Sequence, residues 1–192
     1  MVIRRSSSAD VQELIGELRA SATDESRREV ALARLAVIGK RAIRRILDAL
    51  STARTADEQI AFLLALERLP DERAVQPVLA MLEGSSNRTP PAPLAVRVAA
   101  VRAARPLLDL TTEGTAVLDR LTALILDSAE NGELRWAALE ALSDLPARAM
   151  KPLKRRLEND PDPALRAYAK SKGKPAADGS RRRIGTGRAH RA

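Results

Sequence analysis

A helical repeat that recurs along this 192-residue chain constrains its fold more than any other feature. The template has an aliphatic residue at position 0, Arg at 1, Ala at 4, Ala-Leu at 7 and 8, and Leu at 11. Residues 134–145 match every point, and residues 96–107 miss only the Leu at position 8. Positions 0, 4, 7, 8 and 11 share one face of a helix, so each copy predicts an amphipathic helix with the same buried stripe.

Weaker copies extend the repeat in both directions. Two begin at Arg27 and Glu58 and lack the aliphatic residue at position 0, and a truncated copy begins at Leu165. One such unit cannot bury its own apolar stripe, so stacked neighbours must supply the other side. Apolar residues at helical spacing predict a helix over 10–21 that covers the first unit, and the truncated copy at 163–171 is suited to cover the last one.

A second amphipathic segment follows each copy of the repeat except the truncated one. Residues 74–78 and 149–153 share the phrase Ala-aliphatic-X-Pro-aliphatic, whereas the segment at 42–47 lacks the proline. Because proline is tolerated in the first turn of a helix, the shared proline predicts where the second helix starts. The repeating unit is therefore predicted to be a helical hairpin.

Boundary signals lie where this pattern needs them. An acid or hydroxyl residue followed three positions later by Glu predicts a capping box, Gly predicts a helix end, and Asp-Pro predicts a helix start. Proline late in a helix predicts a kink or an early end. The capping boxes are Asp10 with Glu13 and Thr55 with Glu58, the helix ends are at Gly39 and Gly84, the late proline is Pro106, and the helix start is Asp162 with Pro163. Residues 84–93 are predicted to form a loop.

The positive charge of the chain is concentrated in its tails. Residues 171–192 hold seven Lys or Arg and one acid, and with Arg4 and Arg5 they account for the whole formal net charge of +8. Loss of periodicity predicts disorder in 1–8 and in the basic tail 171–192, with the repeats occupying 9–170. Attraction to polyanions is thus expected of the tails first.

The phrases that open the two helices resemble the HEAT repeat family, especially short bacterial HEAT-like repeats of the pigment-lyase type. Residues 162–166 read Asp-Pro-X-aliphatic-Arg, and residues 149–153 read Ala-aliphatic-X-Pro-Leu. The resemblance covers about residues 24–170 and implies an all-α, right-handed α-solenoid of four to five HEAT-like helical hairpins. In that family the second helices line the concave face. Function does not follow, because scaffolds, pigment lyases and DNA-repair enzymes share the repeat.

Residues for catalysis or metal binding are scarce. Cys is absent and the single histidine, His190, falls in the predicted tail, which argues against a histidine-based triad or a two-histidine metal site inside the fold. We therefore expect no enzymatic activity, no cofactor and no metal. No apolar run approaches the ~18 residues of a membrane span, and a cytoplasmic protein without membrane contact is expected.

Basic residues on the outward side of two predicted second helices are the candidate partner-binding residues. They are Arg41, Arg44 and Arg45 in the first and Lys151, Lys154 and Arg155 in the fourth. One interpretation is an ordinary solvated face, and the other is a groove for an acidic protein segment or for phosphates. Trp136 flanks a buried stripe, where it either packs between neighbouring first helices or anchors an interface.

Three functions are compatible with these features. The first is a non-catalytic scaffold or adaptor that binds a protein partner through the surface of the solenoid. The second is a nucleic-acid-binding HEAT-like protein, with salt-sensitive phosphate contacts from the basic helices and from Arg181, Arg182 and Arg183 of the tail. The third, which only the resemblance suggests, is a pigment-lyase-like or DNA-glycosylase-like enzyme.

Overall fold

The structure, a computed structural model, describes residues 8–21, 23–83, 92–110 and 113–171. Every regular element in these residues is helical, which confirms the all-α prediction for that part of the chain. The elements are α1 (Ser8–Ala20), α2 (Glu25–Ile38), η1 (Gly39–Ala42), α3 (Ile43–Ser51), α4 (Ala56–Arg68), η2 (Glu72–Ala74), α5 (Val75–Leu82), α6 (Leu94–Ala104), η3 (Arg105–Asp109), α7 (Gly114–Leu126), α8 (Gly132–Leu142), α9 (Ala147–Leu157) and α10 (Pro163–Lys170), where η marks a short 3₁₀ helix.

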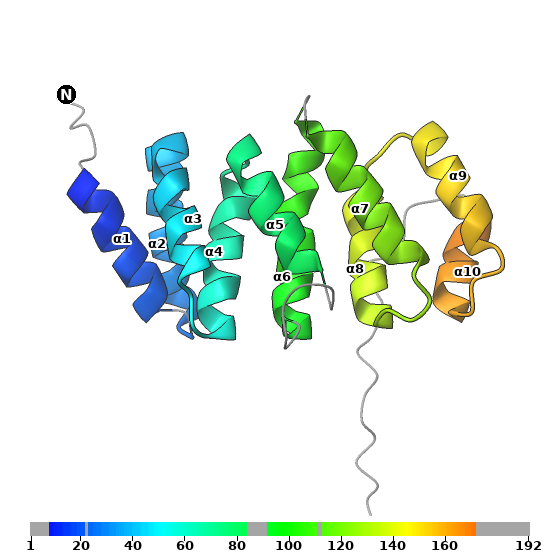
Figure 1. The fold of residues 1–192 in the computed structure, drawn as a ribbon, viewed down its shortest axis with the longest axis horizontal. Helices are drawn as coiled ribbons and strands as arrows, with labels where there is room; N and C mark the ends of the chain where they lie inside the picture. The colour runs from blue at the N-terminus through cyan, green and yellow to red at the C-terminus, as the bar shows by residue number, and fades with distance from the viewer. Residues whose placement is uncertain (1–7, 22, 84–91, 111–112, 172–192) are drawn as a thin grey trace, which may run out of the picture.

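The helices stand side by side in a row along the longest axis of the molecule (Figure 1). The first helices of the repeats pack in succession, α2 on α4, α4 on α6 and α6 on α8. The second helices follow the same order, because α5 contacts α7 and α7 contacts α9. At the two ends, α1 packs on α2, α3 and α4, and α10 packs on α9. The chain thus forms two layers of helices.

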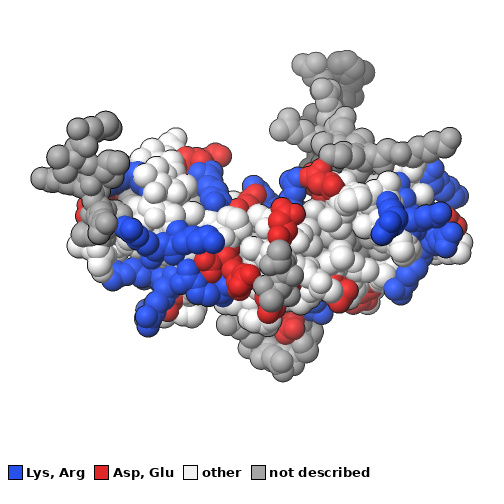
Figure 2. All heavy atoms as spheres, turned by 90° about the horizontal axis from the view of Figure 1, so that it is seen from above, with Lys and Arg blue, Asp and Glu red and all other residues white. Residues whose placement is uncertain are grey.

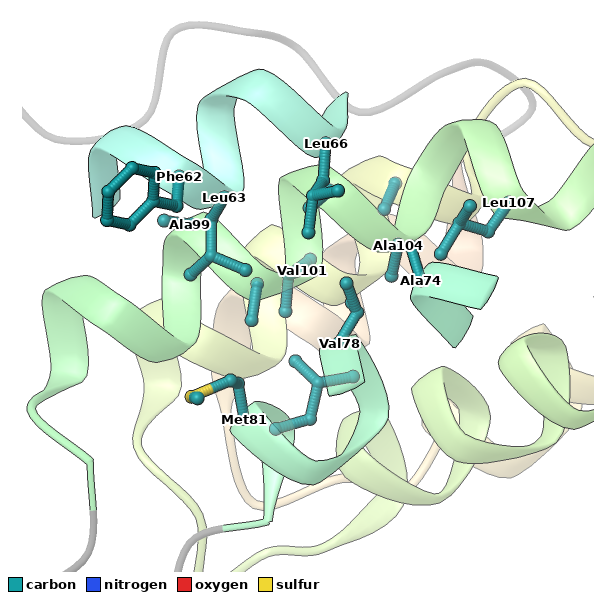
Figure 3. Close-up of a cluster of buried hydrophobic side chains, with 14 of the residues drawn as sticks. Phe62, Leu63, Leu66, Ala74, Val78, Met81, Ala99, Val101, Ala104 and Leu107 are labelled. Carbon is teal, nitrogen blue, oxygen red and sulfur yellow. The ribbon is translucent and has the colours of Figure 1, made fainter. Parts of the chain in front are cut away.

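Buried apolar side chains form one continuous cluster from α1 to α10. Its members include Phe62 and Leu66 at template positions of α4 and Ala100 and Ala104 at the same positions of α6, all fully buried. Figure 3 shows side chains of α4, α5 and α6 meeting in one part of this core. The small alanines of α6 allow neighbouring helices to approach closely. Phe62, the only phenylalanine of the chain, is a packing residue of this core.

Local capping signals were mostly correct. The Thr55 hydroxyl accepts from the N–H of Glu58 at 3.2 Å, and the Glu58 carboxylate accepts from the N–H of Arg54 at 2.9 Å. Asp162 caps α10 by accepting from the N–H of Ala164 at 2.8 Å, with Pro163 in the first turn. Gly39 ends α2 with φ of 71°, a backbone conformation that favours glycine.

Prolines end or begin helices in three of the four predicted cases, with Pro163 of α10 among them. The first helix of the third copy stops at Ala104, so Pro106 marks the early end that was expected. Pro77 lies in the first turn of α5. The prediction for Pro152 is wrong, because α9 begins five residues earlier, at Ala147. Pro152 is on the exposed side of α9, where water can bond the carbonyl that the proline leaves without a donor.

The N-terminal boundary is also corrected. Helix α1 begins at Ser8, so Asp10 lies inside the helix and the predicted capping box at Asp10 is wrong. Ser8, which the sequence places in the disordered segment 1–8, is helical and is the first residue that the structure describes. Gly84, most of the predicted loop at 84–93 and the tail beyond Ser171 lie outside the described residues.

Candidate partner-binding surfaces

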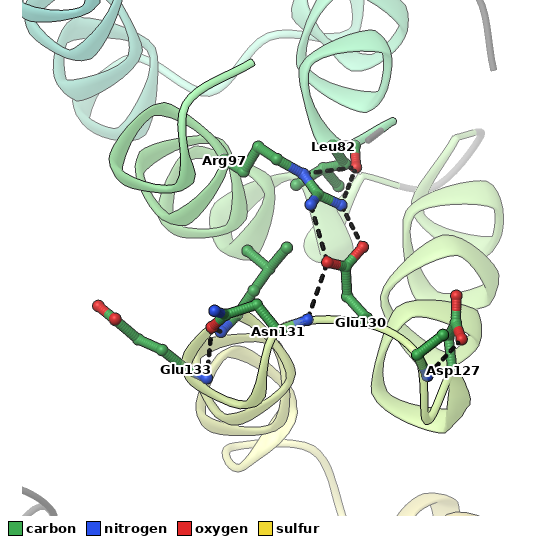
Figure 4. Close-up of polar contacts among 8 residues, drawn as sticks. Leu82, Arg97, Asp127, Glu130, Asn131 and Glu133 are labelled. Carbon is green, nitrogen blue, oxygen red and sulfur yellow. Dashed lines mark hydrogen bonds and ion pairs between the residues drawn. The ribbon is translucent and has the colours of Figure 1, made fainter. Parts of the chain in front are cut away.

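The arginine at template position 1, which sequence reasoning left without a role, is buried and bonded in the third copy. Arg97 is 8% exposed, and its Nε and Nη2 atoms donate to the carbonyl of Leu82, the last residue of α5, at 3.3 and 3.0 Å. Its Nη1 atom donates to Glu130 at 2.9 Å, and its Nη2 atom bonds the other oxygen of that carboxylate (Figure 4). Arg97 therefore joins α5 and α6 to the turn before α8.

Arg135 repeats this arrangement one copy later. It is 2% exposed, donates through Nε to the carbonyl of Ile125 at 2.8 Å, and forms an ion pair with Asp160 in the turn before α10. In the truncated copy, Arg166 donates to the carbonyls of Asp160 and Pro161. Helix carbonyls near a C-terminus lack intrahelical donors, and the arginine supplies one. At Arg97, Arg135 and Arg166 the template arginine is therefore a structural residue of the repeat and is not available to a partner.

The carboxylates that bind these arginines are held in their charged form. The hydrogen bond from Arg97 keeps the pKa of Glu130 below its ordinary value, although burial acts in the opposite direction. For Asp160, burial alone would raise the pKa, but hydrogen bonds from Arg135 and Asp162 and the charges of Arg135 and Arg166 together lower it.

This lowering predicts acid sensitivity. A carboxyl whose pKa is lower in the folded than in the unfolded chain stabilises the fold above its unfolded pKa, about 4 for Asp and Glu. That stabilisation is lost as the pH falls through the lower, folded pKa. Glu130→Gln removes the titrating group, so we expect its melting temperature to fall less than that of the wild type between pH 7 and pH 3. Circular dichroism melts at several pH values measure this, and parallel curves for the two chains would contradict it.

Exposed arginines of the first-helix layer are largely paired across neighbouring helices. The pairs are Arg34 with Glu17, Arg68 with Glu29, Arg102 with Glu67, Arg105 with Asp144, and Arg19 of α1 with Glu58 of α4. Their charges are already neutralised, so little positive charge remains there to attract a partner.

The candidate residues near α3 divide into two groups. Arg41 and Arg44 are exposed and form no hydrogen bond or ion pair with the described residues. Arg45 is half-buried and donates to the carbonyl of Ser8 at 2.9 Å and to Gln12 at 3.2 Å, which fastens α1 to α3. Arg44 and Arg45 also line a groove of about 560 Å³ between these two helices.

The candidate residues of α9 divide in the same way. Lys151 and Arg155 are exposed and unpaired within the described residues. The Nζ atom of Lys154 lies 4.6 Å from the centre of the Tyr168 ring and donates to the carbonyl of Ser171 at 2.9 Å. Helix α9 has five basic residues and no acidic one.

The two basic surfaces are separate. On the face seen in Figure 2, Lys and Arg gather toward the ends of the row and acidic side chains lie between them. The second helices in the middle are mixed: Gln76 of α5 and Asp119 of α7 are exposed. Arg73 of η2 bonds Asp71 at 2.7 Å and the carbonyl of Lys40 at 3.3 Å. No continuous basic track therefore connects α3 with α9 through these residues.

Trp136 packs between neighbouring first helices. It is half-buried on α8, and its ring meets that of Tyr168 on α10 edge to face, with centroids 6.5 Å apart and planes at 82°. Tyr168 is buried, and burial raises the pKa of its hydroxyl. An additional role of Trp136 as an interface anchor stays a prediction.

Arg181, Arg182, Arg183 and His190 lie outside the described residues. Within the described part of the chain, no helix is long and apolar enough to cross a membrane. Comparison of the chain with protein-family models, with curated proteins and with solved structures gives no match.

Proposed function

We propose that the chain is a non-catalytic scaffold that binds an acidic segment of a protein partner through its second helices. In this proposal the two layers are a right-handed HEAT-like α-solenoid of four to five hairpins. The repeated phrases of the sequence and the succession of packed helices support that assignment. A stacked row offers an extended surface on each layer, which repeat proteins use for binding.

The observation that carries the proposal is the difference in pairing between the two layers. Arg34, Arg68 and Arg102 of the first-helix layer are paired with acids. In contrast, Arg41, Arg44, Lys151 and Arg155 of the second-helix layer are exposed and unpaired within the described residues. Unpaired cations can gain an ion pair on binding without losing one, and complementary charge raises the rate and specificity of association. The second-helix layer is therefore the favoured contact surface.

Binding of nucleic acid is the alternative, and the basic composition of residues 171–192 favours it. Contacts to a nucleic-acid backbone normally form a continuous track of cations. The exposed Gln76 of α5 and Asp119 of α7 interrupt such a track between α3 and α9. A protein segment that contacts one or both separate surfaces fits this charge pattern better.

The test is affinity purification from a lysate of the source organism, with and without nuclease. We expect the double variant Arg44→Glu/Arg155→Glu, which reverses one free cation on each surface, to lower partner recovery about tenfold. The control, Arg54→Glu/Arg156→Glu, makes the same change of charge at exposed residues off the two surfaces and should retain the partner: Arg54 is in the segment before α4, and Arg156 points about 100° around α9 from Arg155. Equal recovery with both doubles would refute the proposal. Loss of binding on nuclease treatment or on deletion of 172–192 would favour nucleic acid.

A further inference from the structure

We infer that the groove between α9 and α10 binds a short acidic peptide segment that inserts an apolar side chain. This inference rests on the proposed function and names the chemistry of the partner at one surface. The groove has a volume of about 640 Å³, within the range typical of ligand sites. Its lining comes from the turn after α8, from α9 and from α10.

The lining combines an apolar floor with a basic edge. Met150 and Tyr168, both nearly fully buried, and the half-buried Leu145 supply the apolar part. Lys151 and Arg155 lie one helical turn apart on the same side of α9, so their charges face the same ligand. A surface of this kind suits a segment whose carboxylates contact the edge while one apolar side chain covers the floor.

The charges around the groove leave a positive surplus. Two carboxylates, Asp144 and Glu158, also line it, but Asp144 is ion-paired with Arg105 of η3. Lys154 sits over the Tyr168 ring, where it extends the basic edge toward α10. An acidic ligand would therefore meet three cations and one carboxylate that is not ion-paired within the described residues.

The chain's own terminal segments do not have the composition to fill this groove. Residues 1–7 contain two arginines and no acid, and residues 172–192 contain seven Lys or Arg and one acid. Like charges would repel these segments from Lys151 and Arg155. Lys154 bonds the carbonyl of Ser171, so α10 ends beside the basic edge of the groove. The occupant is therefore expected to be another molecule.

The experiment uses the full chain and a dye-labelled peptide of about ten residues, with Glu at alternate positions, Ser between them and one central Leu. Fluorescence anisotropy should show saturable binding that Lys151→Glu/Arg155→Glu weakens about tenfold or more. The matched control Arg54→Glu/Arg156→Glu reverses two exposed cations that do not line the groove and should leave this binding unchanged. Circular dichroism melts establish that both variants are folded.

Changes in the peptide test the two parts of the groove separately. Replacing every Glu with Gln should abolish binding, and replacing the central Leu with Ser should weaken it several-fold because the floor is apolar. Trp136, the only tryptophan, touches Tyr168, so its emission should change on binding to the wild type and stay constant with the α9 variant. A tail-deleted chain, lacking 172–192, should bind more weakly but keep the Leu preference.

Four results would overturn the inference. The first is that the peptide shows no saturable binding up to millimolar concentration, and the second is that both double variants lose peptide binding equally. The third is that heparin or duplex DNA competes with the peptide and removes the Leu preference. The fourth is self-association of the chain that depends on Lys151 and Arg155. If the peptide fails while capture of the native partner still depends on Arg155, only the groove assignment is wrong. If capture is insensitive to Arg44 and Arg155, the scaffold proposal itself fails.

Discussion

Replacing Asp160 with Ala is expected to lower the free energy of unfolding by about 3–5 kcal/mol, because it leaves a buried guanidinium without its counter-ion. Arg135 and Asp160 are 2% and 7% exposed, so water cannot replace the lost partner. The carbonyl of Ile125 still accepts from Arg135 but carries no compensating charge. The N–H of Asp162 also loses the bond it makes to Asp160 at 2.9 Å.

Denaturant unfolding followed by circular dichroism measures this loss. The control is Asp144→Ala, which breaks an exposed pair with Arg105 and should cost less than about 1 kcal/mol. The double variant Arg135→Met/Asp160→Ala should regain much of the stability, since replacing both members of a buried pair removes the uncompensated charge. Equal losses for Asp160→Ala and Asp144→Ala would show that the buried pair is not a structural link between repeats.

These buried pairs show where sequence reasoning reached its limit. Position 1 of the template is an arginine in four copies, at Arg28, Arg97, Arg135 and Arg166, and its recurrence was visible. Its role was not, because Arg97 bonds Glu130, 33 residues later, and Arg135 bonds Asp160, 25 residues later. Unequal spacing of this kind gives no period to detect. A charged residue beside a buried stripe was the only available signal.

Features that depend on a few neighbouring residues were predicted well. The buried stripe follows from helical periodicity, and caps such as Thr55 and Asp162 bond an N–H within three residues. The start of α9 was predicted incorrectly, because Pro152 is tolerated inside the helix by virtue of its exposed position. A glycine requirement was also missed: a Cβ on Gly114 would lie 2.5 Å from the carbonyl oxygen of Leu108, a contact that the packing of η3 on α7 creates.

On the candidate surfaces too, the exposure of side chains was predictable from the sequence, whereas contacts between distant residues were not. Periodicity correctly placed Arg44, Lys151 and Arg155 on exposed sides of their helices. It could not show that Arg45 reaches back 37 residues to Ser8 or that Lys154 covers the ring of Tyr168. These two cations hold neighbouring helices together, which only the packed structure reveals.

Truncation of Phe62 to Ala is expected to cost about 3–5 kcal/mol, the range observed for buried aromatic residues. Phe62 is fully buried on α4, which packs against α1, α2, α3 and α6, and Arg19 lies over its ring at 5.7 Å. Neighbouring helices cannot close a space of that size without distorting their own contacts. The control Val37→Ala removes a side chain that is 89% exposed and should change stability by less than about 0.5 kcal/mol.

The distribution of this loss along the chain tests the arrangement of the helices. If each helix is stabilised mainly by its neighbours in the row, the cavity should weaken protection from hydrogen exchange most in α2, α4 and α6. Protection in α9 and α10, which do not pack on α4, should fall much less. Native-state hydrogen exchange read out by mass spectrometry resolves these segments. A uniform loss of protection from α1 to α10 would mean that the helices unfold as one cooperative core, and a nearest-neighbour description of the stack would then be wrong.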